Sequence, residues 1–305
     1  MNRPHDPLFD TRQVRRAFSR AAHGYDAAAA LQHEVESRLL ESLDYFGHGS
    51  ERPAPDLVVD LGSGPGTGAR ALRKRWPRAR VVAVDIALPM LREARRRAPP
   101  WRPFQRGIDL VCGDARALPL ADGSVDIVVS NLCLQWVEDL PAVFAGFRRV
   151  LRPGGMLLVS TFGTDTLHEL REAFSVADAE AQHVSPFASI AVFGDALMHA
   201  GFRDPVLDRD NMVNRYSDLP ALMRELRALG ATNALRGRRH TLTGKSRFAR
   251  AQEHYAREHG NEDGLPATWE IITAMAWAPP AGAPIRERDG EIASFPANRI
   301  PVRRR

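Results

Sequence analysis

Three aspartates each follow an apolar run of the sequence, and their spacing is suited to binding a small polar ligand. Asp60 ends the run "LVVD", Asp85 ends "VVAVD", and Asp114 follows "LVCG". In doubly wound sheets, an acidic residue at the end of the second strand, about 20 residues beyond a glycine loop, accepts hydrogen bonds from ribose hydroxyls. Asp85 occupies this position, so we expect a ribose-containing ligand.

A glycine-rich loop, "GSGPGTG", begins two residues after Asp60. Such loops often bind phosphates, but no lysine follows these glycines, so the sequence does not fit the Walker phosphate loop. Counted from Gly64, the spacing G-x-G-x-x-A is present, which leaves a dinucleotide-binding loop open. In either case we expect Gly62, Gly64 and Gly66 to let the backbone approach a ligand closely.

Asp60 favours a ligand without phosphate. A pyrophosphate bound in the loop would be repelled by this carboxylate, whereas a cationic amino group would be attracted. S-adenosylmethionine carries an ammonium, a sulfonium and no phosphate. Asp114 adds an acceptor for the exocyclic amine of adenine, and a third acid of this kind is not part of the dinucleotide fingerprint. The three aspartates therefore predict an S-adenosylmethionine site.

The elements that must position these residues alternate between strands and helices. Continuous Val, Ile and Leu runs separated by helical segments predict a parallel sheet covered on both faces. We expect an α/β fold with a doubly wound, mostly parallel seven-stranded sheet. The expected strands are "DLVVDLG", "ARVVAVDI", "IDLVCGDA", "VDIVVSN", "GMLLVSTFG", "DPVLDRDNMVNRYS" and "ATWEIITAMAWAP".

Helical segments flank and interrupt this alternation. Residues 11–46 have helical periodicity that is broken at Gly24, and further helices are expected at 66–75, 139–151, 218–230 and 243–258 and in "PMLREARRR", "DTLHELREAFSVADAEA" and "SIAVFGDALMHAGF". We expect an N-terminal helical lid over 1–50 and a main domain over 51–277, with helical insertions near 164–200 and 217–260. Residues 278–305 lack periodicity and are expected to form a disordered tail.

Composition sets limits on the location and the partners of the chain. Its 305 residues contain no apolar stretch long enough to span a bilayer, and "MNRPHDPLFD" has no apolar core typical of a secretory signal. The two cysteines, Cys112 and Cys133, have no neighbours at metal-ligand spacing, so we expect a cytoplasmic protein without a metal site. The net charge of +5 comes largely from arginine, and no nucleic-acid-binding module is recognisable. Binding to nucleic acid or to a membrane is therefore not expected.

Four ordered segments resemble the motifs of class I S-adenosylmethionine-dependent methyltransferases. These are "VVDLGSGPGTG", "VVAVDIALPML", "GDARALPLADGSVDIVVSN" and "VLRPGGMLLVST", which together cover residues 57–162. The resemblance implies a methyltransferase domain that binds S-adenosylmethionine. The cofactor-binding residues that it implies are Asp60, Gly62, Gly64, Gly66, Asp85, Ile86, Asp114, Ala115 and Asn131.

The flanking segments carry a narrower resemblance over residues 11–277. The segments "AFSRAAHGYDAAAALQHEV", "SNLCLQWVEDL", "STFGTDTLHELREAF" and "LMRELRALGATNALRGRRHTLTG" are similar to the malonyl-acyl-carrier-protein O-methyltransferases of biotin synthesis. A related family of arginine hydroxylases in complex I assembly shares the core and a similar "YD" segment. Methylation of another small carboxylate or of a quinone precursor, and a non-catalytic binding role, also remain open.

The narrower resemblance implies methyl transfer to the free carboxylate of a malonyl group carried by acyl carrier protein. Because this carboxylate is ionised near neutral pH, it needs no general base, and the enzyme must orient it and exclude water. The implied catalytic residues are Tyr25 and Gln135, and Trp136 and Arg171 are the implied substrate-binding residues. The sequence is equally consistent with Gln135 as a capping residue. Trp136 can also be interpreted as a residue of the core or of the pocket wall.

One further basic feature is a stripe of Arg12, Arg16 and Arg20 on one face of the first helical segment. Such a stripe could speed the association of an acidic carrier protein. A solvated helix face explains the same pattern, and the sequence favours this second interpretation.

Overall fold

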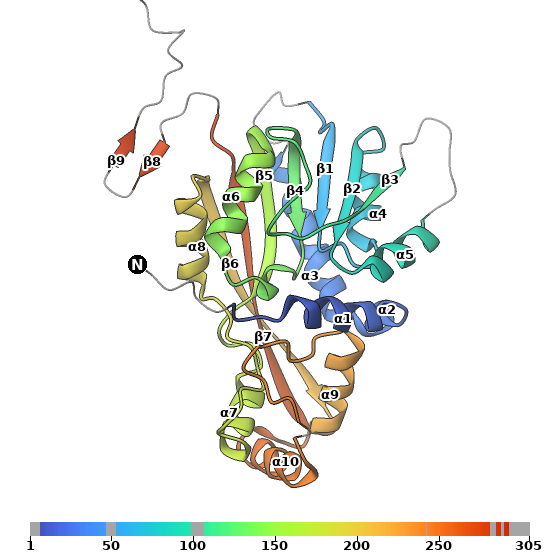
Figure 1. The fold of residues 1–305 in the computed structure, drawn as a ribbon, viewed down its shortest axis with the longest axis vertical. Helices are drawn as coiled ribbons and strands as arrows, with labels where there is room; N and C mark the ends of the chain where they lie inside the picture. The colour runs from blue at the N-terminus through green and yellow to red at the C-terminus, as the bar shows by residue number, and fades with distance from the viewer. Residues whose placement is uncertain are drawn as a thin grey trace, which may run out of the picture.

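The computed structural model describes residues 7–46, 53–98, 107–241, 243–280, 285–287 and 290–292. A seven-stranded sheet organises these residues, in the order β3-β2-β1-β4-β5-β7-β6 (Figure 1). Strands β1 to β5 are parallel, and β7 runs antiparallel to both β5 and β6. This arrangement confirms the expected doubly wound, mostly parallel sheet. The strands are β1 (Leu57–Leu61), β2 (Arg80–Asp85), β3 (Ile108–Cys112), β4 (Val125–Ser130), β5 (Leu151–Phe162), β6 (Arg203–Tyr216) and β7 (Leu265–Trp277).

Helices occupy the segments in which the sequence has helical periodicity. Asp10 caps the first helix by accepting the amide N–H of Gln13, and Asp139, Ser189 and Asp218 cap later helices in the same way. The helices are α1 (Thr11–Ala21), α2 (Tyr25–Ala28), α3 (Ala30–Glu41), α4 (Thr67–Arg75), α5 (Leu88–Arg96), α6 (Leu140–Val150), α7 (His168–Ala177), α8 (Ile190–His199), α9 (Leu219–Ala228) and α10 (Lys245–His259), with short 3₁₀ helices η1 (Ser42–Phe46) and η2 (Leu134–Trp136).

The strand order reverses at β1, which determines where a ligand can bind. In register, Val59 of β1 pairs with Val82 of β2 on one side and with Val128 of β4 on the other. The chain continues from β1 to β2 on one side and from β4 to β5 on the other, so the connections after β1 and β4 diverge. The carboxyl ends of these two strands therefore flank a crevice. The loops after these strands form the walls of the candidate site.

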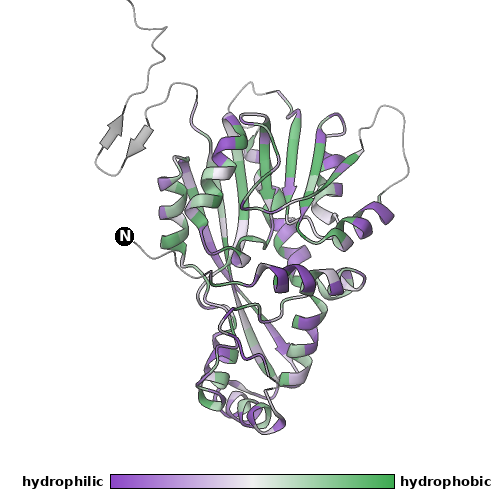
Figure 2. Cartoon of the chain, viewed as in Figure 1, coloured by the Kyte–Doolittle hydropathy of each residue, from purple (hydrophilic) through white to green (hydrophobic). Residues whose placement is uncertain are grey.

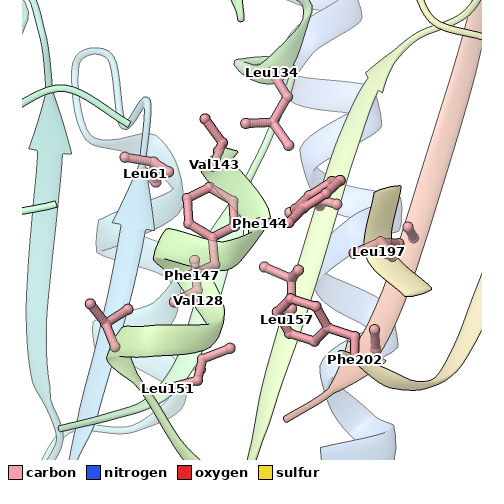
Figure 3. Close-up of a cluster of buried hydrophobic side chains, with 14 of the residues drawn as sticks. Leu61, Val128, Leu134, Val143, Phe144, Phe147, Leu151, Leu157, Leu197 and Phe202 are labelled. Atoms are coloured by element: carbon pink, nitrogen blue, oxygen red, sulfur yellow. The ribbon is translucent and has the colours of Figure 1, made fainter. Parts of the chain in front are cut away.

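Two hydrophobic layers hold the helices on the sheet, because successive residues of a strand face opposite sides. Val58 packs in one layer beneath α3, η1 and α4, while its neighbour Val59 packs in the other beneath α6 and α8. Figure 3 shows the second layer, in which Phe144 and Phe147 of α6 point toward the sheet. Both phenylalanines are fully buried, and their rings meet edge to face with centroids 6.0 Å apart.

Strands β5, β6 and β7 are longer than the others and carry a second helical layer. They contain 12, 14 and 13 residues, against five or six in the first four strands. Their extended ends lie below the main sheet in Figure 1, where α7, α9 and α10 surround them. A separate buried cluster that includes Phe174, Leu222, Tyr255 and Trp269 joins these helices to β7. The helical insertions therefore form a lobe at the carboxyl edge of the parallel strands.

The expected linker and the expected C-terminal tail are described only in part. Residues 47–52 of the expected linker lie outside the described residues, as does most of the expected tail over 278–305. Within that tail the structure describes two short antiparallel strands, β8 (Ile285–Glu287) and β9 (Gly290–Ile292).

In the described part of the chain, none of the helices has the length and apolar character needed to cross a membrane. Figure 2 shows the apolar residues gathered along the central strands, with hydrophilic residues on the outer helices.

Candidate active site

A cavity lies at the carboxyl ends of the parallel strands, beneath α1 and α2. Nine of the residues that the sequence assigned to the site line this cavity, although they come from five separate segments of the chain. They are Tyr25, Gly62, Gly64, Asp85, Ile86, Asp114, Ala115, Asn131 and Trp136.

The glycine loop after β1 forms one wall of the cavity through backbone conformations that require glycine. Gly62, Gly64 and Gly66 have φ angles of +69°, +51° and +81°. A Cβ atom on Gly62 would lie 2.6 Å from the side chain of Cys133, and one on Gly66 would lie 2.9 Å from Ala94. The loop is therefore held close to its surroundings, and its backbone is open to a ligand at Gly62 and Gly64. Gly66 does not line the cavity, because it serves as the N-cap of α4.

Asp85 connects this loop to the end of β2. Its Oδ2 accepts the amide N–H of Gly64 at 2.9 Å, and its Oδ1 accepts that of Ala87 at 2.7 Å. Burial raises the pKa of Asp85 to about 6, and these two hydrogen bonds oppose the shift. Each oxygen retains a free lone pair, so the oriented carboxylate can also accept hydrogen bonds from ligand hydroxyls.

Asp114 lines the cavity at the end of the third strand and is paired with Arg116. Its Oδ1 accepts the backbone N–H and the Nε of Arg116, each at 3.0 Å, and its Oδ2 accepts Nη2 at 2.6 Å. Burial raises the pKa of Asp114, but these bonds to Arg116 outweigh that effect and leave the pKa lowered. The carboxylate is therefore fixed in its ionised form within the cavity.

Asp60 lies behind the glycine loop and does not line the cavity. Its side chain is buried, and burial raises the pKa of the carboxyl to about 7. The amide N–H of Ala69 donates to it, while Oδ2 has no hydrogen-bond partner in the described part of the chain. The sequence predicted that Asp60 lies next to a ligand ammonium, but its side chain is not exposed to the cavity. Its carboxyl group lies close behind the loop instead.

A half-buried carboxyl, Glu36 of α3, lies beside Asp60. A Cβ atom on Gly68 would come within 2.6 Å of Glu36 Oε1 and 3.1 Å of Asp60 Oδ2, so both oxygens approach the same point. Burial, together with the charge of the neighbouring Asp60, raises the pKa of Glu36 to about 8. Arg70 opposes both shifts from the first turns of α4. Two carboxylates this close repel each other when both are ionised, so a cation near the loop would be favourable.

Asn131 and Gln135 follow β4 and have different surroundings. The amide of Asn131 donates to the carbonyl of Gln32 on α3 at 2.9 Å, and its Oδ1 accepts the hydroxyl of Ser160 at 2.7 Å. Asn131 thus joins the N-terminal helices to the sheet and also lines the cavity. Gln135 donates to the carbonyl of Leu132 at 2.7 Å and does not line the cavity, which matches its alternative interpretation as a capping residue.

Tyr25 begins α2 and lies above the glycine loop. A Cβ atom on Gly64 would lie 3.9 Å from the Tyr25 ring, so a side chain at this position of the loop would contact the ring. Burial raises the pKa of the Tyr25 hydroxyl, and the charges of Asp85 and Glu36 add to the shift. The phenol therefore remains protonated at neutral pH and is available as a hydrogen-bond donor.

The N-terminal helices cover the cavity and are anchored at several points. Phe18 of α1 meets Trp136 edge to face, with ring centroids 5.5 Å apart, and both line the cavity. The backbone N–H of Asp10 donates to the carbonyl of Ala234 at 2.8 Å, and the carboxylate of Asp10 pairs with Arg238 at 3.2 Å. These contacts support the expected lid role of the first helical segment.

Arg171 is not brought to this cavity. Its Nη2 donates to the carbonyls of Thr164 at 3.0 Å and Thr166 at 2.9 Å, and the residue lines a different cavity beside α7. The guanidinium thereby stabilises the turn that precedes its own helix, and no described contact connects it with the cavity under α1.

Two residues that line the cavity, Cys133 and Arg116, and one beside it, Glu36, were not identified from the sequence. Cys133 contacts Gly62, and burial raises the pKa of its thiol to about 12, so it remains uncharged. Arg116 could have been found from its spacing to Asp114, because residues two apart in a turn can pair. Glu36 carried no sequence signal, since only the packing of α3 on the sheet places it beside Asp60.

The charges that face the cavity indicate what kind of ligand fits. Among the described residues that line it, Asp85 and Asp114 are acidic and Arg116 is the sole arginine or lysine. Since Arg116 is already paired with Asp114, no free cation is available for a phosphate. The lining also includes apolar side chains such as Leu61, Val84 and Met90. A ligand with cationic groups, hydroxyls and apolar surface fits better than a nucleotide phosphate.

Comparison with known proteins agrees with this fold. Residues 59–159 match the family described as "Methyltransferase domain". Among solved structures, a methyltransferase-like protein from Bacillus halodurans aligns with a TM-score of 0.54 at 17% identity, over 80% of this chain and 98% of the other. The YcgJ protein from Bacillus subtilis aligns with the same TM-score over 79% of this chain. The protein therefore has the class I methyltransferase fold.

Curated relatives define the family more narrowly. A malonyl-(acyl-carrier protein) O-methyltransferase from Xylella fastidiosa is 57% identical over 98% of both chains. A protein of the same name from Gallionella capsiferriformans is 44% identical over 93% of this chain and 95% of its own length. The chain belongs to the malonyl-(acyl-carrier protein) O-methyltransferase family.

Proposed function

We propose that this protein methylates the free carboxylate of a malonyl group on acyl carrier protein, forming the methyl ester that starts pimeloyl and biotin synthesis. The observation that carries this proposal is the 57% identity over 98% of both chains to a relative of that name. The cavity beneath α1 and α2 is the proposed site of the reaction. The two free thiols, Cys112 and Cys133, support a reducing, cytoplasmic setting.

S-adenosylmethionine, when bound, supplies the methyl group from a sulfonium centre. The residues present fit this cofactor, because the cavity has more acidic than unpaired basic groups and its glycine backbone is open at Gly62 and Gly64. We assign the binding of ribose hydroxyls to Asp85, and the binding of adenine to Asp114 with the adjoining Ala115, because all three residues line the cavity. Asp60 and Glu36 supply negative potential from behind the loop.

The chain needs to supply little proton chemistry, because the malonyl carboxylate is already ionised near neutral pH. Its residues instead orient this carboxylate and exclude water from it. The protonated hydroxyl of Tyr25 can donate a hydrogen bond to the carboxylate, which fixes one oxygen while the other remains free to react. Phe18 and Trp136 cover the same region with aromatic surface and limit the access of solvent.

A direct test compares two carrier-protein substrates that differ only in the free carboxylate. Purified protein is incubated with methyl-labelled S-adenosylmethionine and either malonyl- or acetyl-acyl carrier protein. We expect label only on the malonyl form. Label on neither form, with hydroxylation of a protein arginine, would support the related arginine hydroxylase activity instead.

A further inference from the structure

A basic groove lies between α1 and α9, on a face of α1 that adjoins the face lining the cofactor cavity. Arg20 of α1 and Arg224 and Arg227 of α9 line it, and no acidic side chain is among its described lining residues. The floor of the groove contains the hydroxyl of Thr232, whose Oγ1 is buried without a hydrogen-bond partner in the described part of the chain. Small residues such as Ala17 complete the lining.

The arginines of this groove are not used by the fold. All three side chains are exposed, and none forms an ion pair or hydrogen bond with another described residue. In contrast, Arg116 of the cofactor cavity is paired with Asp114. Helical periodicity places Arg16 and Arg12 next to Arg20 on the exposed face of α1, so positive charge extends beyond the groove. Figure 2 shows hydrophilic residues along both α1 and α9.

The groove and the cavity are close neighbours, because α1 contributes to both. Thr11, Val14 and Phe18 face the cavity, whereas Gln13 and Arg20 face the groove. At the end of α1, Gly24 lines the groove and the next residue, Tyr25, lines the cavity. The position of a Cβ on Gly24 would have no atom within 4 Å, so the chain is open at this junction.

We propose that this groove, together with the exposed arginine face of α1, is the docking surface for the acidic surface of acyl carrier protein. The inference rests on the proposed function and adds where the partner binds. Five guanidinium groups spread over two helices cover more surface than a single phosphate can occupy, which favours a protein partner. A carrier protein seated there would be beside the junction at Gly24 and Tyr25, from which its malonyl arm can enter the cavity.

The test reverses charge on both walls of the groove in the variant Arg20→Glu/Arg224→Glu. The matched control, Lys74→Glu/Arg78→Glu, makes the same change in net charge at exposed positions near the amino end of β2. For malonyl-acyl carrier protein, we expect the groove variant to raise KM by about tenfold or more while kcat and the KM for S-adenosylmethionine stay unchanged. The control is expected to keep the wild-type KM.

A substrate without the carrier protein distinguishes docking from damage to the site. Malonyl-pantetheine has the same reacting group but no protein and no phosphate, so the groove variant should methylate it as the wild type does. The proposal would be overturned if the groove variant lost activity equally with both substrates, or if its KM for the carrier protein were unchanged. It would also be overturned if inorganic phosphate or duplex DNA competed as effectively as unloaded carrier protein. Failure of the wild type to methylate either substrate would instead count against the proposed function, and direct binding of carrier protein to wild type and variant would still test the groove.

Discussion

The carboxylate of Asp85 accepts the amide N–H of Gly64 at 2.9 Å, and this bond joins the end of β2 to the glycine loop after β1. The same carboxylate accepts the amide of Ala87 from the other side. One side chain therefore connects two loops that line the cavity, and it lines the cavity itself. We therefore expect the replacement of Asp85 to weaken cofactor binding more than the replacement of any other acidic residue that lines the cavity.

Replacement of Asp85 by Asn tests this role. The amide retains one oxygen acceptor but presents an NH₂ group to a backbone donor, so one of the two loop bonds is lost. We expect the dissociation constant for S-adenosylmethionine, measured by titration calorimetry, to rise by about 10- to 100-fold. Asp122→Asn, at an exposed loop position paired with Arg149, is the control and should leave the affinity unchanged. Equal affinity of the Asp85 variant and the wild type would contradict the assigned role.

The affinity for the cofactor should increase with pH. The pKa values of Asp85 and Asp60 are raised to about 6 and about 7, so both carboxyls become ionised as the pH rises through this range. Ionised carboxylates attract the ammonium and sulfonium groups of the ligand. Calorimetry between about pH 5.5 and about pH 8 should show roughly tenfold tighter binding at the higher pH, and Asp60→Asn should reduce this dependence. Affinity that is constant over this range would exclude the proposed electrostatic contribution.

Asp60 should also limit the stability of the cofactor-free protein. Its pKa is raised from 3.8 to about 7 in the folded state. A raised pKa contributes stability that is fully present below the unfolded-state value and is lost as the pH rises through the folded-state value. Urea unfolding at about pH 8 should therefore show Asp60→Asn to be more stable than the wild type by on the order of 1–3 kcal/mol. A gain of equal size at pH 5 and pH 8 would show that ionisation is not its cause.

The hydroxyl of Tyr25 is expected to act on the substrate more than on the cofactor. Tyr25→Phe removes one hydrogen-bond donor from the cavity and retains the ring that covers Gly64. We expect kcat/KM for malonyl-acyl carrier protein to fall by about tenfold or more, while the dissociation constant for S-adenosylmethionine changes by less than about threefold. Tyr45→Phe, at a 62% exposed position outside the cavity, provides the matched control. Wild-type kinetics for Tyr25→Phe would remove the hydroxyl from the mechanism.

Arg171 should support the fold of the insertion rather than bind the substrate. Arg171→Ala removes hydrogen bonds to the carbonyls of Thr164 and Thr166. We expect a loss of about 1–3 kcal/mol in the free energy of unfolding, with the KM for the malonyl substrate within about twofold of the wild-type value. A large increase in KM at unchanged stability would instead restore the role that the sequence suggested.

The sequence was sufficient to predict the sheet and many of the residues that line the cavity because both depend on local patterns. Apolar runs that end in Asp60, Asp85 and Asp114 define strand ends, and parallel strands bring their ends together without further information. Gly62 and Gly64 could be assigned to the loop because each needs a backbone conformation that other residues rarely adopt.

The remaining parts of the site depend on long-range packing. Arg171 was assigned to the pocket from its place in an insertion, but the first turn of α7 directs its guanidinium to nearby carbonyls. Glu36 contacts the Asp60 region only because α3 packs on the sheet, and no spacing in the sequence encodes that contact. The basic groove also requires α1 and α9 to come together, although they are about 200 residues apart in the sequence.

The identity of the methylated atom tests the central claim most directly. Malonyl-acyl carrier protein is incubated with the enzyme and S-adenosylmethionine, the mass of its prosthetic arm is measured, and the methanol released by mild base is assayed. The proposed function predicts a gain of one methyl group on the malonyl arm and its release as methanol, because base hydrolyses a methyl ester to methanol but leaves a methyl group on carbon in place. An arm of unchanged mass, in the presence of an enzyme that demonstrably binds the cofactor, would contradict the proposal.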